Sequence, residues 1–333
     1  FLPVGSRPLN GTANGATEAR FLQEGVFTPV PYAARKGEKD ATKRRWAGID
    51  RRARVRYTGF IKKRGKCMAH KAKKKQKIGR PNPFLYLLAL LILRPYYRLR
   101  YGVRVDNTAV RGLRGPAIVL APHISNKDHF LVGMALWPRR VTFVLSQHFL
   151  TFPVLGWFLR RMHAIGKRMF SADTRTIMQI LRAKAEGNII VLFPEGRLPA
   201  CGHSLPLADG TATLIQKLDL PVYTVTGNGA YLTFPKWGKY RRRGKILIST
   251  SQLFTAEELA AMTPAEVDEK MRTALAHDDE AAMAGVRYRV KDTTAGLDGI
   301  LRRCPSCGAY GTLVTKRSHI RCTACGLDAT LDE

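Results

Sequence analysis

Residues 116–130 have the sequence PAIVLAPHISNKDHF, in which an apolar run ends abruptly in polar side chains. The run over 117–122 has the length and near-continuous apolar character of a strand that is buried on both faces. A histidine, three polar residues and an aspartate cannot continue such a strand. They indicate either a helix cap or a functional site at the strand's end, and the rest of the chain has to decide between these two.

Apolar strands and helical segments alternate through the middle of the chain. The predicted strands cover 117–122, 140–146, 188–197, 220–227 and 244–252. The predicted helices cover 128–137, 152–162, 174–187, 210–219 and 256–271, with Gly187 as a C-terminal cap. Near-continuous apolar strands separated by helices predict a layered α/β domain whose sheet carries helices on both faces.

The charge of the chain is extreme and uneven. The net charge is +31, and residues 1–80 hold 22 Lys and Arg against 5 Asp and Glu, while the hydrophobic content of 45% excludes global disorder. Such an excess favours a polyanionic partner, either nucleic acid or an anionic membrane surface. We expect residues 1–67 to be a disordered or non-native extension ahead of Met68; a nucleic-acid-binding arm is the competing interpretation.

A basic lead and an apolar segment follow over residues 68–100. The ten apolar residues of Phe84–Leu93 lie between Arg80 and Arg94, and about 20 would be needed to span a bilayer. Flanking basic residues and nearby tyrosines favour a helix that lies in the membrane interface, with a buried core helix or a re-entrant helix as the alternatives.

His123 and Asp128 are separated by four residues. Five steps along a straight helix turn through about 500°, so the two side chains can meet only if His123 precedes the helix and Asp128 lies in its first turn. Ser125 and Asn126 are residues that cap helices, which supports this geometry. An aspartate on one imidazole nitrogen would leave the other nitrogen as a base. The alternative is a turn histidine beside an acid that compensates the helix dipole.

A second buried strand ends in charged residues at Val191–Pro199, VLFPEGRLP. Ligands bind beyond the carboxyl ends of strands in α/β sheets, so the two strand ends together indicate a site. Arg197 can hold a phosphate through its planar fork, and Glu195 can orient either that arginine or a substrate hydroxyl. The alternative is an exposed Glu–Arg pair of little energetic value.

HISNKD and FPEGR, about 70 residues apart, resemble the first and third sequence blocks of the glycerolipid acyltransferase family, which includes the 1-acylglycerol-3-phosphate acyltransferases. The resemblance covers residues 81–252. It places Arg168 at the phosphate-binding arginine of the second block and Pro221 at the proline of the fourth. The third block commonly has a threonine between its glycine and arginine, whereas Arg197 directly follows Gly196, a variant familiar among bacterial members.

The resemblance implies an enzyme in which His123 is the general base, Asp128 holds and polarises its imidazole, and Arg168, Glu195, Gly196 and Arg197 bind the substrate. The acyl donor would be acyl-CoA or acyl-carrier protein, and the acceptor lysophosphatidate or a related lysophospholipid. The implied location is the cytoplasmic face of the cell membrane, on an anionic surface. Catalysis would need no cofactor.

Four cysteines near the C-terminus form two C-x2-C pairs, Cys304/Cys307 and Cys322/Cys325, each followed by a glycine. This spacing predicts a structural Zn²⁺ ribbon, since four thiolates close the coordination sphere; two disulfides are the alternative. The predicted organisation is therefore an acyltransferase domain over 101–280, a linker over 281–300 and a zinc ribbon over 301–333. A nucleic-acid-binding protein that uses the basic arm and the ribbon is the alternative function.

Overall fold

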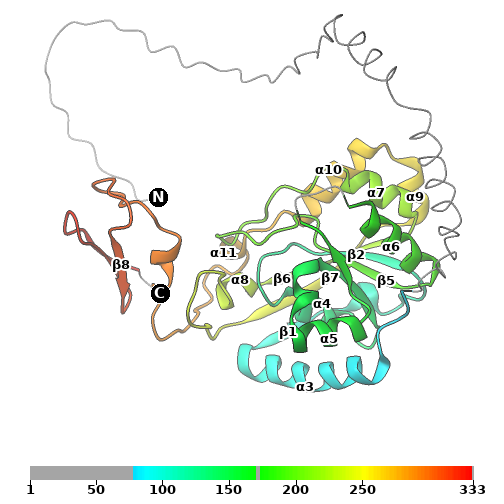
Figure 1. The fold of residues 1–333 in the computed structure, drawn as a ribbon, viewed down its shortest axis with the longest axis horizontal. Helices are drawn as coiled ribbons and strands as arrows, with labels where there is room; N and C mark the ends of the chain where they lie inside the picture. Colours follow the sequence, from blue (N-terminus) through cyan, green and yellow to red (C-terminus); the bar gives the residue numbers. More distant parts are fainter. Residues whose placement is uncertain (1–77, 170–172, 332–333) are drawn as a thin grey trace, which may run out of the picture. The chain divides into compact units, whose positions relative to one another are not determined.

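A computed structural model describes residues 78–169 and 173–331 (Figure 1). The expectations for residues 1–67, and for most of the basic lead, lie outside the described residues.

The described residues contain a seven-stranded sheet in the order β1-β7-β6-β2-β5-β3-β4. Its strands are β1 (Val103–Val105), β2 (Ala117–Leu120), β3 (Val141–Ser146), β4 (Ile165–Lys167), β5 (Ile189–Leu192), β6 (Val222–Asn228) and β7 (Ile246–Phe254). The five strands from β6 to β4 are parallel, whereas β7 runs antiparallel to β6 and parallel to β1. The carboxyl ends of β2 and β5 are therefore adjacent at one edge, in the register Val119 opposite Val191.

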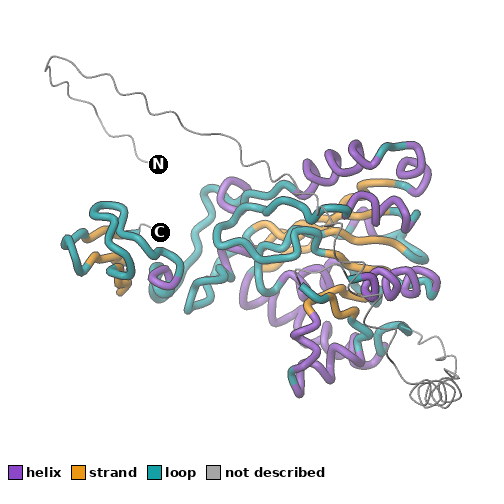
Figure 2. The backbone as a smooth tube through the Cα atoms, turned by 45° about the horizontal axis from the view of Figure 1, so that its top comes forward, coloured by secondary structure: helices purple, strands orange, loops and turns teal. Residues whose placement is uncertain are grey.

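Helices cover both faces of this sheet, as the sequence predicts (Figures 1 and 2). They are α3 (Pro83–Tyr101), α4 (Asp128–Ala135), α5 (Pro153–Arg161), α6 (Thr174–Ala185), α7 (Thr211–Leu218), α8 (Ala230–Thr233), α9 (Ala256–Ala261), α10 (Pro264–Leu275) and α11 (Asp279–Ala282), with 3-10 turns η1 (Thr108–Val110), η2 (Gln147–Thr151) and η3 (Leu297–Gly299). Strand β2 shows why both faces are covered. Ala117 and Val119 join the core cluster that contains α3 and α4, while Ile118 and Leu120 join the cluster that contains α6, α7 and α10. The layered α/β fold is confirmed.

The predicted single helix over 256–271 is wrong, because the structure divides it into α9 and α10. Each helix begins at its own capping box, in which Thr255 pairs with Glu258 and Thr263 with Glu266. Pro264 then occupies the first turn of α10, where its missing N–H costs nothing. The T-P-x-E pattern of residues 263–266 is a signal for the start of a helix, and it therefore also ends the preceding helix, α9.

Helix α3 is longer than the predicted apolar segment. Its first turn is capped by the Asn82 side chain, which accepts from Leu85 N, and it ends at Gly102 in the left-handed conformation. Four residues face the core: Tyr86, Leu90, Tyr97 and Tyr101. The other side is also apolar and is exposed at Phe84, Leu87, Leu88, Leu91, Ile92, Tyr96 and Leu99. Among residues 78–169 and 173–331, no helix has both the length and the apolar character needed to cross a membrane.

The C-terminal region forms a three-stranded antiparallel sheet of β8 (Leu313–Lys316), β9 (His319–Cys322) and β10 (Asp328–Thr330). Its small core consists of Cys304, Leu313 and Cys322. So little apolar area cannot stabilise a fold of this size, which leaves a need for a further cross-link.

Candidate active site

His123 and Asp128 meet in the way that the sequence requires. Strand β2 ends at Leu120 and α4 begins at Asp128, so the histidine lies in the loop and the aspartate in the first turn. His123 Nδ1 is 2.9 Å from Asp128 Oδ2, and Ser125 N donates to the same oxygen over 2.9 Å. Asp128 is buried, and with Nδ1 as the donor, Nε2 of His123 remains available as a base.

The helix cap differs from the expected one. The N-cap position of α4 is Lys127, and no side chain caps the helix. Ser125 instead accepts a hydrogen bond from Lys127 N through its hydroxyl, while its own N–H binds Asp128. Ser125 therefore shapes the turn that brings the histidine back to the aspartate.

Glu195 supports the histidine from the neighbouring strand. Its Oε1 accepts from His123 N over 3.1 Å, and its Oε2 accepts from Leu205 N over 2.9 Å. The side chain is buried, and this burial raises the pKa of the carboxyl group although the two N–H donors oppose the shift. Glu195 thus joins the two sequence motifs through the backbone of His123, and among the described residues its side-chain oxygens bind His123 and Leu205 rather than Arg197.

Gly196 has a φ of +70°, which a residue with a side chain adopts only under strain, so the turn after Glu195 depends on glycine. Arg197 follows it and is exposed. Arg168 is also exposed, and its backbone N–H donates to Asp173, the N-cap of α6. This bond and the Thr176 hydroxyl hold the pKa of Asp173 at about 2.

A cavity of about 510 Å³ opens beside His123. Its polar part includes Lys167, Asp173, Asp209 and Lys236. Its apolar wall comprises Val144, Leu145, Phe149, Met169, Ile177, Ile180, Leu192, Phe193, Leu198 and Leu214. Gly196 and Lys167 line this cavity, whereas Arg168 and Arg197 are absent from its lining. Sequence inspection missed Lys236, which no motif marks.

His129 is a second histidine in the cavity that sequence inspection did not single out. Its ring centroid lies 5.6 Å from that of His123, at an interplanar angle of 89°. The ring also packs on Phe193 at 4.7 Å and on Phe143 at 5.4 Å. Burial lowers its pKa to about 4, with a smaller contribution from His123.

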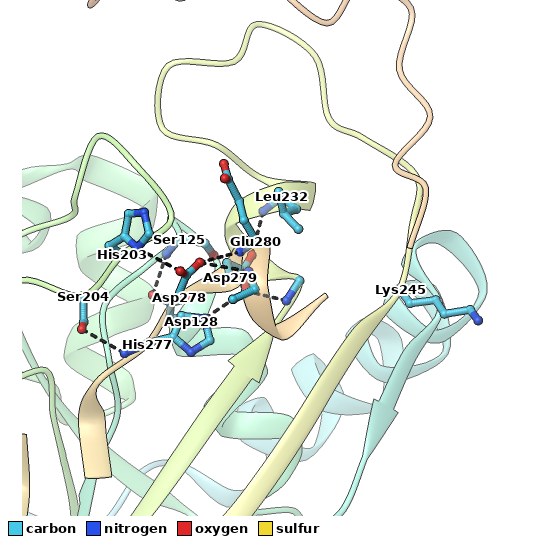
Figure 3. A network of polar contacts seen from close by, with 12 residues as sticks. Ser125, Asp128, His203, Ser204, Leu232, Lys245, His277, Asp278, Asp279 and Glu280 are labelled. Carbon is cyan, nitrogen blue, oxygen red and sulfur yellow. Dashed lines mark hydrogen bonds and ion pairs between the residues drawn. The ribbon is translucent and has the colours of Figure 1, made fainter. Parts of the chain in front are cut away.

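A second histidine–carboxylate pair, His277 and Asp279, is fully buried at some distance along the chain (Figure 3). His277 Nε2 lies 2.9 Å from Asp279 Oδ1, and the backbone of His277 bonds to Ser204. Asp279 also accepts from the backbone N–H groups of Gly229 and Leu232. With every polar atom of the carboxylate directed to local partners, this pair holds the segments around it together.

The four predicted cysteine ligands gather in one cluster. All four sulfur atoms lie within 4.8 Å of one another, with Cys304–Cys325 at 3.7 Å and Cys307–Cys322 at 3.8 Å. Sulfurs at about 2.3 Å from a tetrahedral zinc would be about 3.8 Å apart, whereas a disulfide requires about 2.0 Å. The cluster therefore fits a four-coordinate metal ion.

A histidine held by a carboxylate at the edge of a parallel-dominated sheet, beside a cavity with an apolar wall, can act as a base toward a molecule bound there. Residues 102–227 match the protein-family model described as Acyltransferase. The curated 1-acyl-sn-glycerol-3-phosphate acyltransferase of Limnanthes alba is 26% identical over 176 residues, which cover 47% of this chain and 62% of the relative. The enzyme of the same description from Bacillus subtilis (strain 168) is 23% identical over 191 residues, which cover 54% of this chain and 92% of the relative.

Among solved structures, the 1-acyl-sn-glycerophosphate (LPA) acyltransferase PlsC of Thermotoga maritima aligns with a TM-score of 0.49 and 18% identity, over 68% of this chain and 87% of that one. The resemblance inferred from the sequence motifs is confirmed, because residues 102–227 match the acyltransferase family model and the relatives named above carry that description. The chain spans less than two thirds of the length of the Limnanthes alba relative.

Proposed function

We propose that this protein transfers a fatty acyl group from a thioester to the free hydroxyl of 1-acylglycerol-3-phosphate or a related lysophospholipid. The observation that carries the proposal is the 2.9 Å contact between His123 and Asp128, at the sheet edge and beside the 510 Å³ cavity. Relatives named for this activity match about half of the chain.

In the proposed mechanism, His123 Nε2 removes the proton from the acceptor hydroxyl while Nδ1–H donates to Asp128. The carboxylate fixes the tautomer and stabilises the imidazolium that forms. Glu195 holds the backbone of His123, so that the base keeps its position as its charge changes. The reaction needs no covalent acyl-enzyme, because the hydroxyl attacks the thioester directly.

The acceptor phosphate needs cationic partners. Arg168 and Arg197 stay in this proposed role together with Gly196, whose backbone borders the cavity. Lys167 and Lys236 line the cavity, and we add them to the proposed phosphate site because an ammonium group can pair with a phosphate. Acyl-CoA and acyl-carrier protein both remain candidate donors, and the apolar wall suits the acyl chain of either.

The exposed apolar face of α3 supports attachment to a membrane. Phe84 is 70% exposed, Leu91 68% and Leu99 87%, and Arg94 and Arg98 lie on the same helix. Apolar side chains beside basic ones are typical of helices that lie in the interface of an anionic membrane. We propose this attachment, on the cytoplasmic face, as the route by which a lysophospholipid reaches His123.

We propose Zn²⁺ as the metal of the Cys304, Cys307, Cys322 and Cys325 cluster, in a structural role. Four thiolates leave no coordination position for a substrate, and the ribbon's own core is small. Nucleic-acid binding by the basic arm and ribbon is less favoured, because it leaves the His123–Asp128 pair and its cavity without a use.

The test is an acyl-transfer assay with purified protein, acyl-CoA and acyl-carrier-protein donors, and a panel of lysophospholipids. We expect His123→Ala to lower the rate by roughly 10²-fold or more, because general base catalysis contributes about 10²–10⁴-fold. Asp128→Asn should also be severe, and circular dichroism should show both variants folded. A folded His123→Ala variant with full activity would contradict the proposed mechanism.

A further inference from the structure

His129 occupies a place in the cavity that the proposed mechanism leaves without a role. It follows Asp128 in the first turn of α4 and lines the same cavity as His123. Its ring stands perpendicular to that of His123, and both rings pack on Phe193, at 4.6 Å for His123 and 4.7 Å for His129. The two imidazoles are therefore held against a common aromatic wall.

The polar atoms of His129 have no protein partner among the described residues. Its ring packs on the rings of His123, Phe143 and Phe193, and no hydrogen bond accompanies these contacts. An N–H that is removed from water without a partner costs free energy, so such groups are normally satisfied. Neither ring nitrogen is among the fully enclosed polar atoms that lack a partner, so each keeps some exposure, and the residue lines the cavity. A molecule bound in the cavity would therefore supply the missing hydrogen-bond partner of His129.

The protonation state of His129 suits a hydrogen-bond donor. Burial keeps its pKa at about 4, so at neutral pH the ring is uncharged and carries one N–H. The charged or titratable groups that border the same cavity are His123, Lys167, Asp173, Asp209 and Lys236. A neutral donor beside His123 stabilises developing negative charge without taking the proton that His123 must accept.

The geometry of acyl transfer sets the distance at which such a donor is needed. The attacking oxygen lies about 3 Å from the base and about 3 Å from the carbonyl carbon, and the carbonyl oxygen is a further bond away. A donor to that oxygen therefore lies several ångströms from the base, on the other side of the reacting carbon. The 5.6 Å between the two ring centroids meets this requirement.

We propose that His129 donates a hydrogen bond to the carbonyl oxygen of the acyl thioester and stabilises the oxyanion that forms there. This inference rests on the proposed function. As the acceptor oxygen bonds to the carbonyl carbon, its proton passes to His123 and the negative charge collects on the carbonyl oxygen, facing His129. When the carbon–sulfur bond breaks, the thiolate leaves and takes the proton from His123. His123 is then neutral again, and His129 has lost and gained no proton.

The test compares three substitutions at this position. His129→Phe keeps an aromatic ring and removes the donor, His129→Gln places an amide N–H near the Nε2 position, and His129→Asn places one near Nδ1. His148→Phe is the matched control, because His148 lies on η2 and is absent from the cavity lining. Each variant is assayed for kcat, for the KM of the acyl donor and for its thermal unfolding temperature.

We expect His129→Phe to lower kcat by about 10²–10³-fold, the usual effect of removing one oxyanion donor, with the donor KM within about threefold. One of the two amide variants should recover at least about tenfold of that loss, because it restores an N–H. His148→Phe should behave as wild type.

A His129→Phe variant with a kcat within about threefold of wild type would overturn the inference and leave the proposed function in place. Equal losses in all three variants, together with a lowered unfolding temperature, would also overturn it, since that pattern indicates packing. Wild-type protein that transfers no acyl group from any donor would instead remove the proposed function, and this inference with it.

Discussion

Glu195→Gln tests the link between the two motifs, because the substitution keeps the shape of the side chain and changes only its hydrogen bonding. In the wild type, each carboxylate oxygen accepts from one backbone N–H, of His123 and of Leu205. A glutamine has one acceptor oxygen and one NH₂ group. In the variant, one of the two backbone N–H groups must therefore face the NH₂ group of the glutamine, so that two donors oppose each other inside a buried site.

Two effects of opposite sign determine the size of the change. A hydrogen bond to a charged group contributes about 1.5–3 kcal/mol, and an unsatisfied buried N–H costs about 1–3 kcal/mol. The opposing effect is that the variant no longer buries a charge. The raised pKa of Glu195 shows that burying this charge costs free energy in the wild type. We expect the lost hydrogen bonding to outweigh the gain from no longer burying a charge, with a net destabilisation of about 2 kcal/mol. We also expect kcat to fall by roughly 10- to 100-fold as His123 shifts.

Urea unfolding at pH 7.5 and the acyl-transfer assay measure both quantities. The matched control is Glu258→Gln, at the exposed capping box of α9, where glutamine serves as well as glutamate and the change should stay under about 0.5 kcal/mol. The pH dependence gives a further check. Because the pKa of Glu195 is raised in the folded state, its contribution to stability is greatest below the ordinary carboxyl pKa and is lost as the pH rises through the folded value. The glutamine variant lacks this pH dependence of the unfolding free energy. If Glu195→Gln and Glu258→Gln were alike in stability and rate, Glu195 would not support His123.

Three further predictions concern other parts of the molecule. Purified protein should contain about one zinc per chain by metal analysis, and Cys304→Ser should lower that content and loosen the ribbon; a zinc-free protein with two disulfides would contradict this. Replacing Phe84, Leu91 and Leu99 with serine should move the protein from vesicles to the supernatant in a sedimentation assay, with release by high salt only partial in the wild type, because apolar burial is not screened; full release by salt alone would exclude apolar attachment. His129 should make the protein less stable as the pH is lowered from about 6.5 to about 4, because the unfolded state takes up a proton there that the folded state does not. The loss is about 1.4 kcal/mol per pH unit, or roughly 3 kcal/mol in total, and His129→Phe should abolish this part of the pH dependence in unfolding titrations.

The sequence predicted the sheet where its signal was strong. Strands such as β2 and β5 are buried on both faces, so every residue in them is apolar and the run stands out. The three-residue strands β1 and β4 carry no such signal, because a segment that short has no measurable period. The full length of α3 was missed for a related reason: its last two turns contain Arg94, Arg98 and Arg100, which break the apolar run without breaking the helix.

The sequence could predict only those contacts of the site that join one side chain to another. The condition that His123 precede the helix and Asp128 begin it follows from helix geometry, and the structure meets it. The partners of Glu195 are backbone N–H groups, and every residue except proline has one, so no sequence pattern marks them. Lys236 and His129 were missed because only the folding of the chain brings them to the cavity.

The structural unit that positions the proposed base extends beyond the residues that match the acyltransferase family model. The match ends at residue 227, yet Asp279 binds the backbone N–H groups of Gly229 and Leu232 directly after β6. Gly229 has a φ of +86°, and an added Cβ there would collide with the carbonyl of Lys245, so this turn depends both on the glycine and on the buried carboxylate. His277 and Ser204 bond to each other close to Asp279 (Figure 3). Asp279 N also donates to Gly202 O, and Ser204 directly precedes Leu205, whose N–H donates to Glu195. Because Glu195 also holds His123, the position of the proposed base depends on residues about 150 positions away, and we infer that a fragment ending at residue 227 would leave these buried donors unsatisfied.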